Sequence, residues 1–484
     1  MSSHQRIALT IPRDPTARAN PESTSAMSGI NTTIEWMTRR RALTSILMGY
    51  VYAALVVAGP WIFTVLGLVG LSSASSAAGS DQLPVFRSIV IYNSLFSLAV
   101  TSPLAFLSGR YISDQLHVGR TQCIFFVLVA SLCVFSLLTL GIAAPFYLLA
   151  TDLSGPAQFA AIQNAFLIGV SWLLIPFLGA IKAHVPMLVA FGTNALSMIL
   201  LGSLLSDPPA TALLMAFNAS FAITDAILIG TVVRKFGKHI ELDPNLLKFA
   251  PWKWELPLAG LVYALGLWAD KVIMWYGAPS GGLRVAGVLQ TMPSYDTAMF
   301  WAQLASIPVV AVAFVHVETR FSSLFSRFYG RLDRHASLRE LTSAMAKLRT
   351  FVISSIVILF VALAIVATMT ILISFVFMSE LGLRPTYMSI LRASLLAMVF
   401  YTCSMFCFIF LLYFDLRRQG LLIVSTFFVL NTLFTLALLP LGQAYYGYGN
   451  MIAAAATFVF AFTILLRELP WLHYHAFITN NTSL

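Results

Sequence analysis

The sequence predicts an all-α polytopic membrane protein with about twelve transmembrane helices. Of its 484 residues, 59% are hydrophobic and 10% are charged, whereas a soluble domain carries roughly 25% charged residues to cover its surface. The apolar residues also fall in blocks of about 20, the length of helix that crosses a hydrocarbon core roughly 30 Å thick. Each block is therefore predicted to span the membrane.

Apolar length and helix breakers place these spans in two sets of six. The first set is expected near 43–69, 84–108, 121–141, 158–180, 185–205 and 211–233. The second set is expected near 256–277, 297–317, 351–377, 388–413, 420–440 and 451–467.

The basic connector 234–255 separates the two sets, and the sequence shows no internal repeat between them. It divides the chain into an N-terminal lobe, 27–233, and a C-terminal lobe, 256–470. The segments 1–26 and 471–484 are expected to be cytoplasmic tails, the first of them disordered because it has no apolar run.

The distribution of basic residues predicts the orientation. With both termini inside, all but five of the 29 Lys and Arg residues fall in cytoplasmic segments. The exceptions are Arg284 and Arg384 in outer loops and Arg87, Lys271 and Arg392 within spans. Basic loops stay on the cytoplasmic side, so a multi-pass inner-membrane protein with both termini cytoplasmic is expected. The net charge of +10 then reflects this topology and anionic lipid headgroups, not nucleic acid.

The long segment 320–349 has the pattern of an amphipathic helix. Phe321, Phe325 and Phe328 recur at helical spacing with arginines elsewhere around the helix, which predicts a helix lying in the inner headgroup layer. Ser337 and Glu340 then form a capping-box pattern that predicts a second short helix leading into the ninth span. This region is expected to contact lipid or a cytoplasmic partner through Glu318, Arg320, Arg327, Arg331 and Arg334.

Motifs for enzymatic chemistry are absent from the sequence. It contains no G-x-x-x-x-G-K-[ST] phosphate loop, no Asp-x-Asp pair and no H-E-x-x-H helix, so ATP hydrolysis, metal-dependent sugar transfer and zinc proteolysis are not indicated. We therefore expect no enzyme activity, no cofactor and no metal, and transport would be secondary or driven by a partner.

Six ionisable residues lie within or at the ends of predicted spans, where a charge is costly and usually marks a pathway or a pair. They are Arg87, Asp225, Asp270, Lys271, Asp296 and Arg392. Asp270 and Lys271 are adjacent and point about 100° apart on a helix, so their partners are expected on other helices.

A network of Asp270 or Asp296 with Arg87 or Arg392 is one prediction. The alternative is that Arg87, Arg392 and Asp296 reach the membrane interface from the span ends. Asp270 is the first candidate for an ion-coupling carboxylate, and Asp225 is the second.

Aromatic residues are concentrated around the seventh and eighth spans. They are Tyr263, Trp268, Trp275, Tyr295 and Trp301. Such rings suit the stacking of sugars in a binding cavity. Aromatic residues also belt membrane interfaces, so both interpretations remain open.

Several stretches resemble those of one transporter family. They are 27–30, 39–41, 58–61, Gly-Arg-Tyr-Ile-Ser-Asp at 109–114, Trp-Ala-Asp-Lys at 268–271, Trp275, 295–296, 307–308, 318–321, 328–329, 413–415, Asn431 and Tyr-Gly-Tyr-Gly at 446–449. Together they resemble the PelG family, the membrane transporters of Pel exopolysaccharide systems, over about residues 27–480. That family belongs to the superfamily of the oligosaccharide-lipid flippases and multidrug extruders. Residues 1–26 have no counterpart there, and 31–36 match only loosely.

The resemblance implies two six-helix lobes around a central cavity and export of an N-acetylhexosamine polymer through the inner membrane. It also implies a complex with a PelF-like glycosyltransferase and with PelD-like and PelE-like membrane proteins. Other functions remain open: an ion-coupled small-molecule or drug antiporter, a flippase for lipid-linked oligosaccharides, or a non-transporting scaffold for a polysaccharide synthase.

Overall fold

A computed structural model describes residues 43–76, 82–181, 183–205, 208–237, 253–279, 282–334, 336–376 and 385–472, with Leu246, Phe249 and Pro251. The expected tail 1–26, nearly all of 471–484, Arg384 and most of the connector 234–255 lie outside these residues.

A long helix lies at the position of each predicted span. The helices of the first set are α3 (Leu43–Ser76), α4 (Leu83–Val118), α5 (Ile124–Leu149), α6 (Gly155–Ala180), α7 (His184–Ser203) and α8 (Ala210–Phe236). Those of the second set are α10 (Glu255–Gly277), α11 (Pro293–His316), α13 (Leu338–Val376), α14 (Pro385–Tyr413), α15 (Arg417–Leu438) and α16 (Tyr448–Glu468). Among the described residues, eleven helices are long and apolar enough to cross a membrane, and α3 contributes the shorter apolar stretch Ala58–Ser73.

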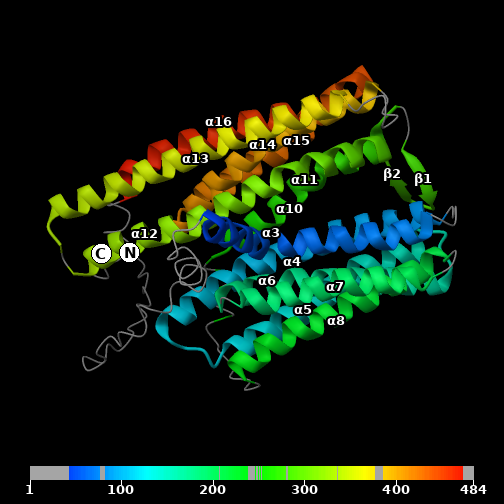
Figure 1. Ribbon diagram of the computed structural model, residues 1–484, viewed down its shortest axis with the longest axis horizontal. Helices are drawn as coiled ribbons and strands as arrows, with labels where there is room; N and C mark the ends of the chain where they lie inside the picture. Colours follow the sequence, from blue (N-terminus) through cyan, green and yellow to red (C-terminus); the bar gives the residue numbers. More distant parts are fainter. Residues whose placement is uncertain are drawn as a thin grey trace, which may run out of the picture.

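The helices pack as two lobes with the same internal order. In the first lobe, α3 packs on α7, α4 packs on α6, and α6 packs on α8. In the second lobe, α10 packs on α15, α11 on α14, and α14 on α16. In Figure 1, helices α13 to α16 of the second lobe lie above helices α4 to α8 of the first. The packing is therefore repeated although the sequence shows no repeat, because many combinations of apolar side chains fill the same helix interfaces.

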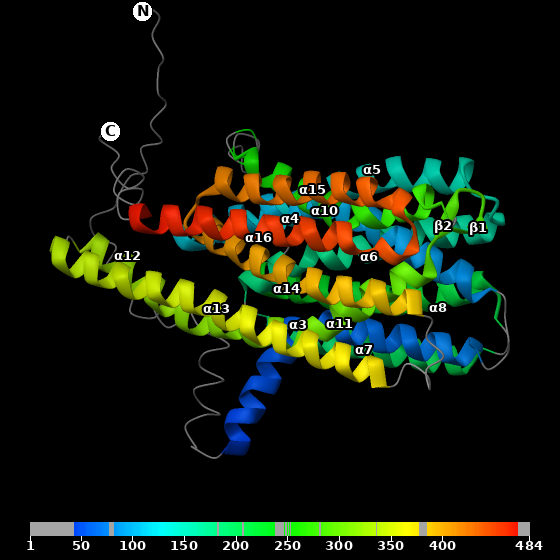
Figure 2. The same cartoon turned by 90° about the horizontal axis from the view of Figure 1, so that it is seen from above.

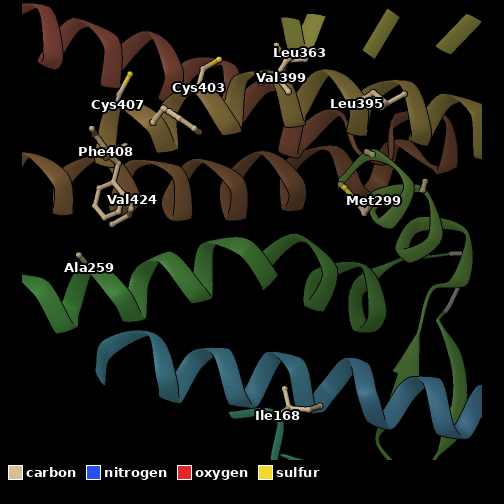
Figure 3. Packing of buried hydrophobic residues seen from close by; sticks show 14 of the residues in the cluster. Ile168, Ala259, Met299, Leu363, Leu395, Val399, Cys403, Cys407, Phe408 and Val424 are labelled. Atoms are coloured by element: carbon tan, nitrogen blue, oxygen red, sulfur yellow. The ribbon is translucent and has the colours of Figure 1, made fainter. Parts of the chain in front are cut away.

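The two lobes meet through equivalent pairs of helices. The second helix of one lobe packs on the first helix of the other, α4 on α10 and α3 on α11. At Gly260 of α10 the backbones come so close that a Cβ would lie 2.6 Å from the carbonyl oxygen of Ser102 in α4. The largest buried apolar cluster accordingly includes residues of both lobes, among them Ile168 of α6 and Val424 of α15 (Figure 3).

The structure differs from the prediction in the segment 320–349. A π-helical turn, η1 (Val317–Phe321), continues α11 into α12 (Ser322–Asp333). Helix α13 is continuous from Leu338 to Val376. The predicted second short helix is therefore the N-terminal part of α13 and is not a separate helix. The Phe321 ring lies 5.1 Å from that of Phe410 and 5.9 Å from that of Phe414 in the segment that ends α14. The apolar face at the start of α12 therefore packs on protein, whereas the prediction placed it against headgroups.

The capping box at the start of α13 forms as its sequence indicates. The backbone N–H of Ser337 donates to Oε2 of Glu340 at 3.1 Å, and the backbone N–H of Glu340 donates to Oγ of Ser337 at 3.4 Å. The reciprocal bonds satisfy two backbone donors that a helix start leaves unpaired.

A short β-hairpin connects α10 to α11. Its strands, β1 (Leu283–Ala286) and β2 (Leu289–Thr291), are antiparallel with an irregularity between Arg284 and Ala286. The turn residue Gly287 has φ +58°, a conformation that favours glycine. We call this end of the bundle the hairpin end and the other the α12 end; Figure 2 shows α12 and the start of α13 projecting beyond the other helices.

Candidate ion-coupling site

Asp270 of α10 lies at the centre of a buried polar cluster in the second lobe. Its side chain is fully buried, and its carboxylate accepts hydrogen bonds from three other helices. The Tyr295 hydroxyl (α11) donates to Oδ2 at 2.6 Å, and Asn450 Nδ2 (α16) donates to the same oxygen at 3.0 Å. Asn431 Nδ2 (α15) donates to Oδ1 at 3.4 Å. Several neutral donors thus stabilise one buried negative charge.

The partner of Asp270 with opposite charge is its neighbour in sequence, contrary to the prediction. Lys271 Nζ lies 3.4 Å from Asp270 Oδ1 and donates to the Leu267 carbonyl at 2.9 Å. The lysine stem is long enough to fold back along the helix, so its ammonium reaches Asp270 although the two Cβ atoms diverge. The same ammonium lies 5.7 Å from the centroid of the Trp268 ring, within range of a cation–π interaction.

Close packing of α15 and α16 brings the two asparagines to this cluster. A Cβ at Gly449 would lie 2.6 Å from the backbone nitrogen of Thr435 in α15, so only glycine permits this approach. The Asn431 amide also donates to the Gly266 carbonyl of α10 at 3.0 Å, which ties α15 to α10 beside Asp270.

Asp296 forms a second acidic site in the first turn of α11. Both of its oxygens accept a hydrogen bond from Trp275 Nε1 at 3.0 Å, and Oδ2 also accepts one from the Met292 backbone N–H at 3.0 Å. A carboxylate in the first turn of a helix is stabilised by the helix dipole. The adjacent residues Tyr295 and Asp296 thus connect α11 to α10 at two points.

The structure does not bring Arg87 or Arg392 to either carboxylate, so the predicted network with those arginines is wrong. Both side chains are exposed, and the Arg392 guanidinium lies 5.8 Å from the Phe375 ring. Trp301 is also exposed, whereas Trp275 and Tyr295 are buried. The alternative placed Arg87, Arg392 and Asp296 at the membrane interface. The two arginines are exposed, as that alternative requires, whereas Asp296 is hydrogen-bonded to Trp275.

Asp225, the second candidate carboxylate, lies in the first lobe. It is buried in α8, where the Ser171 hydroxyl of α6 donates to Oδ1 at 2.5 Å. Its Oδ2 has no hydrogen-bond partner within the described part of the chain. Asp225 and Asp270 therefore occupy separate sites, one in each lobe.

The structure contains two polar clusters that a prediction from charged residues within the spans does not reveal. In the first lobe, Asn93 donates to Asn164 at 2.9 Å, Asn164 donates to Asn218 at 2.7 Å, and the Tyr147 hydroxyl donates to Asn93 at 2.8 Å. Three asparagines within predicted apolar spans, Asn93, Asn164 and Asn218, are the sequence feature that indicates this cluster. These amides hydrogen-bond to one another, which fits a role in holding α4, α5, α6 and α8 together.

The other cluster joins the lobes at the α12 end. Asp415, between α14 and α15, lies 3.8 Å from Arg110 Nη2 of the first lobe, 3.6 Å from Lys253 Nζ and 3.2 Å from Arg417 Nε. Glu255 lies 3.4 Å from both Arg417 and Arg418. Burial lowers the pKa of Lys253 from its ordinary value, and Asp415 opposes this shift. These groups form an ion-pair cluster that includes residues of both lobes, and we call it the Asp415 cluster.

The basic residues predicted to contact lipid or a partner lie on the projecting part of the α12 end. Arg320, Arg327, Arg331 and Arg334 are exposed, as is Glu318. Arg331 also donates to the Glu340 carbonyl at 3.2 Å, which ties α12 to the start of α13.

The fold is that of a membrane transporter of the MATE type. The structure is similar to a MOP superfamily transporter from Pyrococcus furiosus, with a TM-score of 0.60 at 14% identity over 87% of this chain and 96% of that one. It is also similar to an outward-facing MATE multidrug transporter (TM-score 0.58, 14% identity, 86% and 95% covered) and to an inward-facing one (0.53, 16%, 86% and 94%). No curated protein matches the sequence.

The sequence narrows this class to one family. Residues 27–477 match the model of the PelG family, described as "Putative exopolysaccharide Exporter (EPS-E)". The chain therefore belongs to the PelG family and is a multi-pass membrane transporter.

Proposed function

We propose that this protein exports a Pel-type polysaccharide, rich in N-acetylhexosamine, from the cytoplasm across the bacterial inner membrane. The family match over nearly the whole chain supports this substrate. The two-lobe fold supports a transporter rather than an enzyme as the role of this chain.

The α12 end faces the cytoplasm in this proposal, and both termini lie on that side. Exposed arginines lie on α12 and at the start of α13, whereas the hairpin end carries Arg284. Basic segments remain on the cytoplasmic side of a membrane, which supports this orientation.

The buried pair Asp270–Lys271 supplies the coupling step. A proton or another cation that binds Asp270 cancels the charge that holds Lys271 at 3.4 Å. The ammonium and the donors on α11, α15 and α16 then reorganise, because an unpaired buried charge is costly. A change of partners at the centre of the second lobe can bias the packing between lobes.

The exposed face of α12 docks the partners of the exporter: a PelF-like glycosyltransferase and PelD-like and PelE-like membrane proteins. Phe321 of η1 and Phe325 on the apolar side of α12 are already packed against Phe414, so the exposed arginines are the part of α12 left for an acidic surface. They are Arg327, Arg331 and Arg334. Anionic lipid headgroups compete for the same charges.

The test uses a strain that makes the polymer and lacks this gene. Restoring the gene should move polymer from the cell into the medium. A tagged chain should co-purify the synthase, and the charge reversal Arg327→Glu with Arg331→Glu should reduce that recovery while insertion stays normal. If the variant recovers as much synthase as the wild type, the exposed face of α12 contacts lipid and not the synthase.

The same strain separates the alternatives. Polymer secretion that is independent of the gene, together with efflux of a cationic dye that depends on it, would indicate an antiporter and overturn the exporter proposal. Accumulation of a lipid-linked oligosaccharide in the deletion strain would indicate a flippase. Full secretion by variants that cannot change conformation would indicate a scaffold.

A further inference from the structure

The β1–β2 hairpin belongs to the second lobe but contacts the first. Both strands contact α4, and the backbone N–H of Val288 in the turn donates to the Ala150 carbonyl at the end of α5 at 3.0 Å. Leu289 of β2 is fully buried. The hairpin is therefore anchored across the boundary between the lobes.

Tyr92 of α4, in the first lobe, hydrogen-bonds to the hairpin. Its hydroxyl donates to the Gln290 carbonyl at 2.8 Å, accepts from the Gln290 N–H at 3.1 Å, and lies 2.8 Å from the Tyr276 hydroxyl of α10. Its ring stacks on Trp275 with centroids 4.8 Å apart. One side chain of the first lobe thus contacts α10 and β2 of the second.

The turn of the hairpin fits against the first lobe without room for a side chain. A Cβ at Gly287 would lie 2.7 Å from the Ala150 carbonyl oxygen and 2.8 Å from Thr151 Cα. Real Cβ atoms do not approach so closely, so any larger residue must push the turn away.

The hairpin is also connected to the buried carboxylates. β2 ends at Thr291, and α11 begins at Pro293; its first turn carries Tyr295, which binds Asp270, and Asp296, which binds Trp275. Trp275 in turn stacks on Tyr92. A displacement of the hairpin therefore pulls on residues that hold both acidic sites.

The geometry points to a clasp: the β1–β2 hairpin, Tyr92 and the α5 terminus at Ala150 hold the hairpin ends of the two lobes together and must separate for substrate to leave at that end. This inference rests on the proposed function for its substrate. The clasp itself is a property of the two lobes. Its opening is linked to the Asp270 site through the first turn of α11.

A reversible cross-link tests the clasp. Ala150→Cys and Val288→Cys are introduced together with Cys133→Ser, because Cys133 is the exposed native cysteine and the other three, which are buried, react slowly. Oxidation, or a short bis-maleimide, should stop polymer export, and reduction of the disulfide should restore it. The control pair, Leu283→Cys with Thr291→Cys, joins two residues paired within the hairpin and should export normally in both states.

Export that continues with positions 150 and 288 fully cross-linked would overturn the clasp and leave the exporter proposal intact. If the chain exports no polymer at all, distances between spin labels at positions 150 and 288 still test whether the clasp opens. The clasp predicts two distance populations, and Tyr92→Phe should raise the ratio of long to short distances about tenfold, since it removes up to three hydrogen bonds. A single population unchanged by Tyr92→Phe would contradict the clasp.

The glycine of the turn provides an independent variant. Gly287→Ala should shift the same distances towards the long population. Gly119→Ala is the matched control, because Gly119 also has positive φ but a Cβ there would meet no atom within 4 Å. An equal shift in both variants would mean that backbone strain alone acts, and would contradict the steric role of Gly287.

Discussion

At the scale of single residues, the site depends on how far a side chain can reach. Adjacent residues on a helix point in different directions, which predicts that Asp270 and Lys271 do not pair. The flexible lysine stem reverses this outcome, since Nζ lies 3.4 Å from Asp270 while it bonds the Leu267 carbonyl one turn back. Side-chain length here outweighs the spacing of Cβ atoms.

Substitutions at this pair should be strongly non-additive. Lys271→Gln leaves Asp270 charged and buried without its cation, which costs about 3–5 kcal/mol, whereas Asp270→Asn with Lys271→Gln leaves no charge at all. We expect the double variant to be more thermostable in detergent than Lys271→Gln alone; a double variant that melts lower than Lys271→Gln would argue against this pairing.

The single variant Asp270→Asn tests the coupling step. Asp270→Asn should abolish export while the protein still inserts, and Arg87→Gln, whose side chain is exposed, should export normally. Wild-type export by the Asp270→Asn variant would overturn the coupling role of Asp270.

At the scale of helices, glycines determine which helices can share a site. Gly449 permits α16 to approach α15, and the next residue, Asn450, reaches Asp270 at 3.0 Å. The stretch 446–449 therefore acts on the site through the position of a helix. This explains how a segment with no ionisable group within the site still contributes to it.

Gly449→Val should separate α15 from α16 and withdraw Asn450 from Asp270. We expect reduced export and a lower melting temperature in detergent. Gly230→Val is the control: it places the same β-branched residue in a helix where a Cβ meets nothing within 4 Å. Equal losses in the two variants would mean that helix propensity, not packing, causes the effect.

At the scale of the whole molecule, the lobes are joined at both ends. The clasp joins them at the hairpin end, and the Asp415 cluster joins them at the α12 end through Arg110. Alternating access requires the contacts at the two ends to open in turn. The stretches 109–114 and 413–415, which resemble the family, supply Arg110 and Asp415, the ion pair that joins the lobes at the α12 end.

Asp415→Asn should weaken the α12 end without straining the chain, because asparagine tolerates the positive φ of 57° at this position. Loss of the carboxylate also lowers the pKa of Lys253 further. A lysine with a lowered folded-state pKa adds stability as pH rises from that value towards its unfolded value, since the unfolded chain then binds more protons. Melting temperatures measured between pH 7 and 10 should therefore begin to rise at a lower pH in the variant than in the wild type; identical profiles would contradict this role of Asp415.

The class of protein, the approximate number of helices and the buried charge at Asp270 could all be predicted from the amino-acid sequence. These follow from apolar length and from the cost of a charge in lipid, which act on each segment separately. The folded structure alone showed three features: the residues that hydrogen-bond to Asp270, the repeated packing of the lobes, and the clasp. The hydrogen-bonding residues are Tyr295, Asn431 and Asn450. Contacts between helices depend on how side chains interlock across interfaces far apart in sequence, and many sequences satisfy one packing.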